Sequence, residues 1–308
     1  MPNPPRVSVI MPNYNKEKYI GPAIQSVLNQ TFRDFELIVV DDASTDGSSL
    51  AIQTYVDRDS RVRLVENTRN QGVGAAMNSG IKLSKGPCIA FLGSDDVLSP
   101  RKLELQVDAL DKEPNPTVIY CDWWSMDQDG KVLSADWVKP HAKDGMLFEE
   151  LLKENFIIAN AVIMVPSVCF EKVGLFDPLL VSGQDYDLVL KLARNYPFKF
   201  ILESLYGYRI HSDNSVRRLR RRSYYGYKAE VVNRHLIQNS TALTIETRTY
   251  VKRKVFLLYV ASRQYRKILR SGLSSWETFR LLVSLPLRTR RNKEIIAEEA
   301  VLDSGHGR

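Results

Sequence analysis

The chain has 308 residues, of which 44% are hydrophobic and 26% are charged, and its formal net charge is +7. This composition excludes a disordered or fibrous chain, and the length suits one large α/β domain with an appendage, or two domains. The cysteines Cys88, Cys121 and Cys169 stand apart in the sequence, which argues against a zinc ribbon or disulfide scaffold and fits a cytoplasmic protein. No signal peptide is expected at the N-terminus, and the apolar stretch Val255–Ala261 is much shorter than the roughly 20 residues of a membrane-spanning helix.

The charge is divided unevenly along the chain. Residues 1–215 contain 22 Lys and Arg against 29 Asp and Glu, a net charge of −7, whereas residues 216–308 contain 21 against 7, a net charge of +14. We therefore expect a folded domain over 1–215 and a basic, mainly helical region over 216–308. An acidic body that handles phosphates needs a cation, and a basic tail favours an anionic surface.

The first hundred residues alternate between apolar runs and helical patterns. The predicted strands are Val7–Met11, Phe35–Val40, Val62–Val65 and Cys88–Leu92. The predicted helices are Ile20–Leu28, a segment that follows the capping residues Ser44-Thr45-Asp46, Gly72–Leu83 and Lys102–Leu110. Four strand–helix units in succession favour a mostly parallel central sheet with helices on both faces.

The remainder of the chain does not continue the regular alternation of predicted strands and helices. Between residues 117 and 215 we expect further strands and helices that extend the sheet and form the second wall of a cleft, including a helix over Gln184–Arg194 and a long strand over Phe198–Ile210. Residues 216–308 have helical spacing, with Trp276 and Phe279 among basic residues. That mixture is typical of a helix that lies on an anionic membrane surface, although a solvated helical face is the alternative.

Polar clusters follow three of the predicted strands. They are Asn13-Tyr14-Asn15, Asp41-Asp42 and Asp95-Asp96. Asn and Asp are also common in turns, but ligands of open parallel sheets bind at the carboxyl edge of the strands, so three clusters there favour a binding site.

The chemistry of that site is not that of a dinucleotide or P-loop protein. The loop Pro12–Asn15 has no glycine, and Gly72-Val73-Gly74 lacks the later glycine of a dinucleotide fingerprint. A carboxylate-lined nucleotide site remains, in which Asp42 accepts a hydrogen bond from a base and Tyr14 stacks on it. Asp95-Asp96 has the oxygen ligands that Mg²⁺ and Mn²⁺ prefer.

Several segments together resemble glycosyltransferase family 2, whose fold is the Rossmann-like GT-A fold. The resemblance covers about residues 6–215 and rests on Val9–Asn15, Ser26–Thr31, Phe35–Asp46, Asn70–Gly80, Phe91–Asp96, Gln184–Leu188 and Tyr208–His211. It implies inverting transfer of a sugar from a nucleoside diphosphate sugar, with Mn²⁺ or Mg²⁺ as cofactor.

The resemblance also implies roles for individual residues. Asp185 is the catalytic base, although a plain helix-start acid is the alternative, and Asp187 is structural. Asp96 and His211 hold the metal, and Gly93 stands where the family often has a further aspartate. The donor-binding residues are Pro12, Tyr14, Asn15, Asp42, Asp95, Asp96 and Arg209.

The predicted reaction is therefore metal-dependent hexosyl transfer in polysaccharide or glycoconjugate synthesis of the cell envelope. UDP-sugar is the preferred donor, because Asp42 can accept from N3–H of uracil; dTDP-sugar stays open because thymine offers the same group. The acceptor is a hydroxyl of a glycan or a lipid-linked molecule, the basic region can bind an anionic membrane surface, and no nucleic acid is expected. A sugar-phosphate nucleotidyltransferase and a non-catalytic docking module are the alternatives; the first would need a Gly-rich loop after the first strand.

Overall fold

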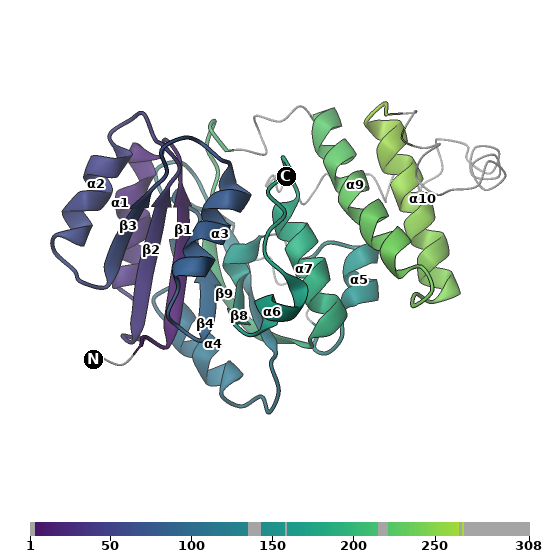
Figure 1. The fold of residues 1–308 in the computed structure, drawn as a ribbon, viewed down its shortest axis with the longest axis horizontal. Coiled ribbons are helices and arrows are strands. Elements are labelled where there is room, and N and C mark those ends of the chain that lie inside the picture. Colours follow the sequence, from purple (N-terminus) through teal and green to yellow (C-terminus); the bar gives the residue numbers. More distant parts are fainter. Residues whose placement is uncertain (1–3, 135–142, 158, 215–220, 265–266, 268–308) are drawn as a thin grey trace.

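The computed structural model describes residues 4–134, 143–157, 159–214, 221–264 and 267, which form a mixed α/β fold around one curled sheet (Figure 1). The strands are β1 Val7–Asn13, β2 Phe35–Asp41, β3 Val62–Glu66, β4 Cys88–Phe91, β5 Val97–Leu98, β6 Val118–Met126, β7 Val132–Ser134, β8 Ile163–Pro166 and β9 Phe198–Arg209. The helices are α1 Glu17–Leu28, α2 Ser48–Val56, α3 Val73–Leu83, α4 Lys102–Leu110, α5 Phe148–Lys153, the 3₁₀ turn η1 Asn160–Val162, α6 Cys169–Val173, α7 Gln184–Asn195, α9 Arg221–Asn239 and α10 Ile245–Ala261.

The sheet has a parallel half and a mixed half. Its strand order is β3-β2-β1-β4-β8-β6-β9-β5, with β7 beside β6. Strands β3, β2, β1 and β4 are parallel, as the strand–helix units predict, and β6 and β9 are also parallel. Strand β8 runs antiparallel to both β4 and β6, so residues 117–215 extend the sheet as expected.

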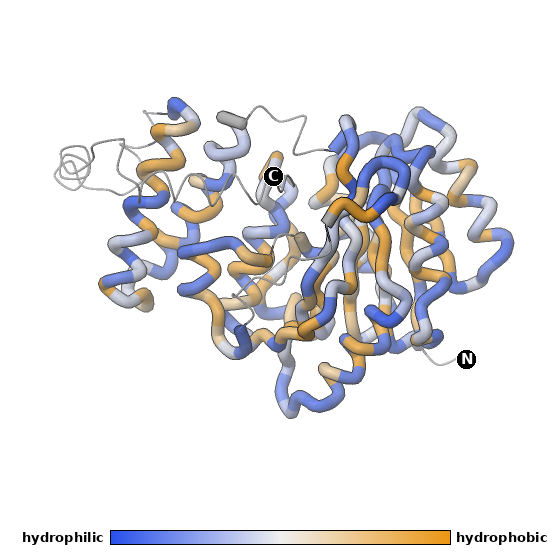
Figure 2. The backbone as a smooth tube through the Cα atoms, turned by 180° about the vertical axis from the view of Figure 1, so that it is seen from behind, coloured by the Kyte–Doolittle hydropathy of each residue, from blue (hydrophilic) through white to orange (hydrophobic). Residues whose placement is uncertain are grey.

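The apolar runs of the sequence become the buried strands. Every residue of β2 is buried, which is typical of a parallel strand covered by helices on both faces. Figure 2 shows the central strands largely in the orange of hydrophobic residues and the outer turns in blue.

Helix α1 begins earlier than its sequence pattern indicates. The pattern predicts a helix from Ile20, but the helix begins at Glu17 and contains Pro22. The backbone N–H of Glu17 donates to Asp46 Oδ2 at 3.0 Å. Because this cap comes from the loop after β2, the local sequence could not show it.

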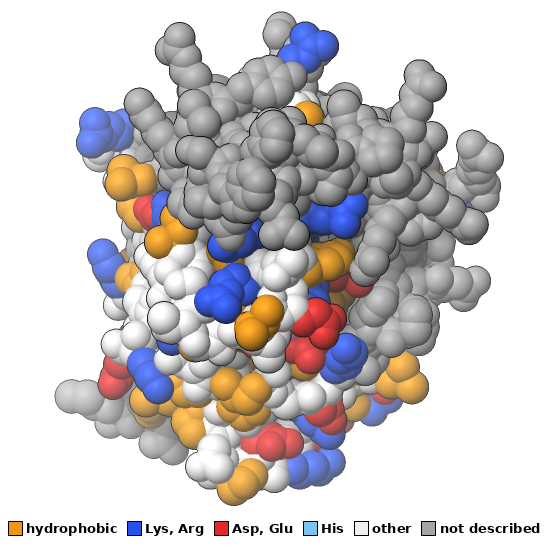
Figure 3. All heavy atoms as spheres, turned by 90° about the vertical axis from the view of Figure 1, so that its right-hand side faces the viewer, with side chains coloured by type: hydrophobic (Ala, Val, Ile, Leu, Met, Phe, Trp, Pro, Cys, Tyr) orange, Lys and Arg blue, Asp and Glu red, His pale blue; other side chains and the backbone are white. Residues whose placement is uncertain are grey.

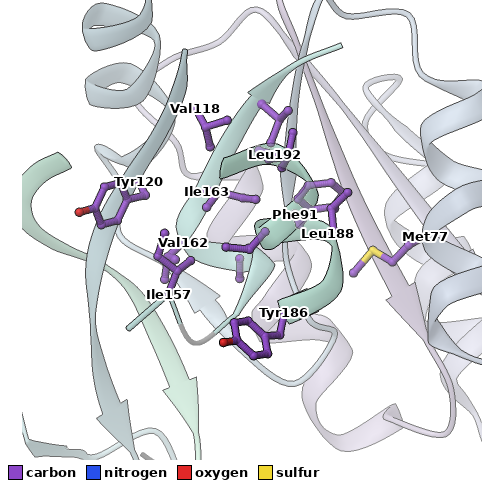
Figure 4. Packing of buried hydrophobic residues seen from close by; sticks show 14 of the residues in the cluster. Met77, Phe91, Val118, Tyr120, Ile157, Val162, Ile163, Tyr186, Leu188 and Leu192 are labelled. Carbon is purple, nitrogen blue, oxygen red and sulfur yellow. The ribbon is translucent and has the colours of Figure 1, made fainter. Parts of the chain in front are cut away.

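Helix α7 is fixed to the sheet by its apolar face. Leu188 and Leu192 are fully buried and lie with Phe91 of β4 and Ile163 of β8 in one cluster (Figure 4). Burying each leucine contributes about 1.5–3 kcal/mol, so the position of the start of α7 is set by packing.

The C-terminal helices α9 and α10 lie side by side next to α5 and α7 (Figure 1). The buried Lys254 of α10 donates to the carbonyl of Lys153 at 3.0 Å, at the end of α5. At this end of the molecule, charged and hydrophobic side chains are interspersed over the visible described surface (Figure 3). The helical pattern around Trp276 and Phe279 lies outside the described residues.

Candidate active site

The polar clusters of the sequence meet at the carboxyl edge of the parallel strands. In the register of the sheet, Asn13 is opposite Asp41, and Ile10 is opposite Phe91. The loops that carry Tyr14, Asp42 and Asp95-Asp96 therefore leave the sheet at the same edge.

The first two loops are joined by a network around Asn13, Asn15 and Ser44. Asn13 Nδ2 donates to Asp41 Oδ2 at 2.7 Å, and the Asn15 backbone N–H donates to Ser44 Oγ at 2.9 Å. Asn15 Oδ1 accepts from the Thr45 N–H at 2.7 Å. Asn15 has a φ of 52°, a left-handed conformation that asparagine tolerates, so its first structural role is to turn the chain.

Tyr14 is the exposed member of this loop. Its side chain is 41% exposed and Pro12 is half-buried, so the Tyr14 ring is accessible to a planar ligand. Stacking of a base on an aromatic ring contributes about 1–3 kcal/mol.

Asp42 is buried and holds the loop before α3. Its Oδ1 accepts from Asn67 Nδ2 at 2.7 Å, its Oδ2 accepts from the Gly72 N–H at 2.8 Å, and the Gln71 N–H lies 3.0 Å from both oxygens. These contacts use most of the acceptor capacity of a carboxylate. The sequence did not predict these hydrogen bonds to the loop before α3, and the role of Asp42 in base recognition stays a prediction.

Asp95 and Asp96 differ in their surroundings and in the direction in which their pKa values move. Asp96 Oδ1 accepts from the Arg209 N–H at 2.8 Å and Oδ2 from the Tyr206 hydroxyl at 2.6 Å. Burial raises the pKa of Asp96 well above its ordinary value, and the charge of Asp95 adds to the effect. Burial also raises the pKa of Asp95, but His211 and Lys16 outweigh it, so that this pKa lies below its ordinary value.

Two cationic or polar groups face Asp95. Lys16 Nζ lies 2.7 Å from Asp95 Oδ2, and His211 Nε2 lies 3.0 Å from the same oxygen. The Asp213 N–H donates to His211 Nδ1 at 3.1 Å, so Nε2 is the ring nitrogen that faces Asp95.

Gly93 makes this arrangement of carboxylates possible. A Cβ at this position would lie 2.8 Å from Asp96 Oδ2 and 3.2 Å from Asp95 Oδ1. The aspartate that the family often has here would therefore require both carboxylates to move.

Arg209 is buried and serves the loops of the site. Its Nε donates to the Asp95 carbonyl at 2.7 Å, and its Nη1 donates to the Gln128 carbonyl at 3.2 Å. The guanidinium thus supports the backbone beside Asp95, and its predicted contact with the donor stays a prediction.

Asp185 lies in the first turn of α7, after Gly183, which has a φ of 84°. A Cβ on Gly183 would also lie 3.2 Å from Val231 of α9, so glycine suits both the backbone conformation and the close packing. The dipole at the start of a helix favours a low pKa for a carboxyl in the first turn. Instead burial raises the pKa of Asp185 to about 6, against a hydrogen bond from the Asn160 backbone that lowers it.

The start of α7 lies near the same sheet edge as Asp42 and Asp95. Asn160 begins η1, the turn that immediately precedes β8, and the first residues of β8 pair with the end of β4. On the other side, an added Cβ on Gly74 of α3 would lie 3.6 Å from Gln184 Cγ. The Asn160 backbone hydrogen bond on one side and the approach of Gln184 to α3 on the other place the start of α7 near the loops that carry the other carboxylates.

Asp187 is structural in its contacts, as predicted. It is fully buried, with Lys191 Nζ 2.6 Å from Oδ2 and His235 Nε2 3.0 Å from Oδ1. This network ties α7 to α9.

The residues fit a divalent cation at Asp95. Among the described residues, no group of three or more His, Cys, Asp or Glu side chains could enclose a metal ion. Mg²⁺ and Mn²⁺ often use only one or two protein ligands, and substrate phosphates and water supply the rest. Asp95, with His211 beside it, and the adjacent Asp96 supply carboxylate oxygens for such an arrangement.

Sequence reasoning missed Lys16 and Tyr206. Lys16 directly follows the Pro12–Asn15 loop, so its place in the sequence was a usable signal. Tyr206 lies on β9, two residues before the Tyr208–His211 motif. Its contact with Asp96 depends on the pairing of β5 with β9, which the local sequence does not show.

The family model for glycosyl transferase family 2 matches residues 8–165. This chain belongs to that family.

Curated relatives match this chain over about 70% of its length. An uncharacterized glycosyltransferase of Methanocaldococcus jannaschii is 32% identical over 72% of this chain and 77% of its own length. One from Rickettsia prowazekii is 36% identical over 68% of this chain and 65% of its own length. Chondroitin synthase of Escherichia coli is 31% identical over 68% of this chain, but the match covers 30% of that enzyme.

Solved transferase structures share the GT-A fold with this family 2 chain. S. aureus TarS, residues 1–349, in complex with UDP-GlcNAc aligns with a TM-score of 0.61 and 18% identity, over 86% of this chain and 91% of TarS. The mannosyltransferase PcManGT of Pyrobaculum calidifontis, in complex with GDP-Man and Mn²⁺, aligns with a TM-score of 0.57 and 16% identity, over 99% of this chain and 86% of its own. The expected GT-A fold is thus confirmed.

Among the helices that the structure describes, each is too short or too polar to cross a membrane.

Proposed function

We propose that this family 2 glycosyltransferase moves a sugar from a nucleoside diphosphate sugar to a hydroxyl of a glycan or lipid-linked acceptor, with inversion at the anomeric carbon. One observation carries the proposal. Asp185, with its pKa raised to about 6, stands at the start of α7, near the strand edge where Asp95 meets Lys16 and His211. A general base and an anion-binding group near one edge are what a single displacement requires.

Asp185 acts as the base in this reaction. Its carboxylate takes the proton of the acceptor hydroxyl while that oxygen forms a bond to the anomeric carbon. The bond from that carbon to the diphosphate breaks at the same time, and the electron pair leaves with the nucleoside diphosphate. A pKa near 6 keeps the carboxylate mostly ionised at neutral pH and makes it a stronger base than an ordinary aspartate.

Asp95 and His211 are the side chains that would hold a divalent metal, Mn²⁺ or Mg²⁺. When bound, the metal neutralises the negative charge that develops on the leaving diphosphate. Asp96 accepts hydrogen bonds from the Tyr206 hydroxyl and the Arg209 N–H, and its role as a metal ligand stays a prediction.

A uracil nucleotide is the donor that we propose, with Tyr14 as the stacking residue and Pro12, Asn15, Asp42 and Arg209 in the surrounding loops. The UDP-GlcNAc bound to TarS supports a uracil nucleotide as donor. The GDP-Man bound to PcManGT leaves a guanine nucleotide as the alternative donor. Because Asp42 already accepts three backbone or side-chain N–H donors, recognition of uracil N3–H by Asp42 would require one of them to give way.

We further propose that residues 1–215 form the catalytic domain and that the basic region 216–308 binds an anionic membrane surface at the cytoplasmic side. The net charge of +14 over that region supports the second proposal. Flotation of the full chain with vesicles of anionic and of zwitterionic phospholipids tests it. Equal recovery with both vesicle types would contradict electrostatic membrane binding.

The transfer reaction is tested with the purified full chain and a panel of nucleotide sugars. We expect Mn²⁺-dependent binding of UDP by calorimetry, and slow release of UDP from a UDP-sugar as water replaces the acceptor. Asp185→Asn should retain UDP binding and lose turnover by about a hundredfold or more. Asp108→Asn, which removes an exposed carboxylate of α4, is the matched control and should change neither quantity. Loss of UDP binding in Asp185→Asn would assign this residue to the donor site instead.

A further inference from the structure

The side chain of Lys16 is directed into the candidate site by the loop that precedes α1. Asn15 takes its left-handed conformation immediately before it, and the Lys16 N–H donates to Ser48 Oγ at 3.0 Å. The Lys16 carbonyl accepts from the N–H groups of Tyr19 and Ile20 in the first turn of α1. The backbone of Lys16 is thus fixed on both sides, which leaves the position of its ammonium group to the side chain.

The ammonium group of Lys16 lies within the site, away from bulk solvent. Its Nζ is 2.7 Å from Asp95 Oδ2 and 3.3 Å from the Asp213 carbonyl, and the side chain is only 14% exposed. Lys18 offers a contrast two residues later, because its side chain is 61% exposed and its Nζ is 3.9 Å from Asp129 Oδ1. Ordering a lysine side chain to this degree costs rotamer entropy, which the ion pair with Asp95 offsets.

Lys16 meets Asp95 at the oxygen that also faces His211. A divalent cation bound to Asp95 Oδ2 would face the positive charge of Lys16 at close range, and like charges repel. Lysine is a mobile point charge on a four-carbon stem, with three donor hydrogens that suit phosphate oxygens. If a metal displaced the Lys16 ammonium group from Asp95, the diphosphate of the donor would therefore offer it another anionic partner.

We propose that Lys16 is a donor-binding residue with two alternative partners. Without ligands its ammonium group pairs with Asp95, and when a divalent cation binds Asp95 the ammonium group pairs with the diphosphate of the nucleotide instead. This inference rests on the proposed function, because it requires a nucleoside diphosphate at Asp95. It assigns Lys16 two opposite effects, since the lysine competes with the free metal and cooperates with the nucleotide.

The test uses Lys16→Met in the full chain, with Mn²⁺ alone and UDP in the presence of Mn²⁺ as separate calorimetric probes. We expect Mn²⁺ alone to bind about tenfold more tightly than to the wild type, because the competing charge is gone. UDP with Mn²⁺ should bind about tenfold more weakly, because a charge-assisted contact is lost. Lys16→Arg should retain UDP binding close to that of the wild type, and Lys18→Met should change neither affinity.

Asp95→Asn provides an independent measurement if Lys16→Met does not fold. Removing the carboxylate frees the ammonium, so UDP in the presence of a chelator should bind several-fold more tightly than to the wild type. UDP binding without metal that is unchanged or weaker in Asp95→Asn would overturn the proposal.

The remaining outcomes separate this inference from the proposed function. If the wild type binds UDP with Mn²⁺ but folded Lys16→Met has both wild-type affinities, Lys16 is a structural ion pair and the inference fails alone. If Lys16→Met binds both Mn²⁺ alone and UDP with Mn²⁺ more weakly than the wild type, the inference is also overturned, because Lys16 would then not compete with the metal for Asp95. A wild type that binds no nucleotide with any metal would overturn the proposed function, and this inference with it.

Discussion

Lowering the pH from 7 to 5 is expected to remove most of the transferase activity, because Asp185 must be ionised to accept a proton. With a pKa of about 6, the ionised fraction of this carboxyl falls from about 90% at pH 7 to about 9% at pH 5, a tenfold loss. With the ordinary aspartate value of 3.8, about 94% would still be ionised at pH 5 and the rate would hardly change.

The physical origin of this difference is burial. Asp185 is held at the start of α7, whose Leu188 and Leu192 are fully buried, and its own side chain is partly buried there. The positive end of the helix dipole and the Asn160 N–H both favour the ionised form, but the loss of hydration outweighs them.

The assay is the initial rate of UDP release at saturating UDP-sugar and Mn²⁺, from about pH 4.5 to about pH 8. UDP binding by calorimetry at the same pH values separates loss of the base from loss of the donor. A rate that stays level down to pH 5, while UDP binding also stays level, would refute the assignment of a raised pKa to a catalytic Asp185.

Three further changes test the packing and charge of the site. Asp185→Asn should raise the melting temperature at pH 7.5 by a few degrees, because a neutral amide removes a carboxylate whose ionised form is disfavoured there; a lower melting temperature in calorimetry would contradict this. Gly93→Ala should destabilise the fold by about 1–3 kcal/mol, since its Cβ would meet Asp96 Oδ2 at 2.8 Å, and an unchanged denaturation midpoint would be against it. The Asp187→Ala and His235→Ala variants should show a coupling energy of about 1–3 kcal/mol in a double-mutant cycle of chemical denaturation, whereas additive losses would mean that the buried pair contributes no net stability.

The local sequence determined much of the fold. The apolar run Phe35–Val40 and the alternation of strands with helices predicted the parallel half of the sheet, because a parallel strand buried on both faces requires a continuous apolar run. The helical pattern over Gln184–Arg194 likewise predicted α7. The motif at Asp95-Asp96 was visible for the same reason, since ligand-binding loops follow the carboxyl ends of such strands.

The functions of individual carboxylates depended on partners that are distant in the sequence. Asp95 and Asp96 are adjacent and chemically identical, but Asp95 faces Lys16 and His211, whereas Asp96 faces Tyr206 and the Arg209 backbone. Their pKa values consequently move in opposite directions. A charge responds to its surroundings in three dimensions, and these partners lie about 80 to 120 positions away along the chain.

The sequence by itself determined the family, the parallel strand–helix units and the edge of the sheet at which a ligand binds, because periodicity and strand-end motifs are local. Only the tertiary structure decided that Asp42 holds the loop before α3, that α1 is capped by Asp46, and that burial outweighs the helix dipole at Asp185. Hydrogen-bond partners and desolvation arise when distant segments pack together, so a local pattern contains no record of them.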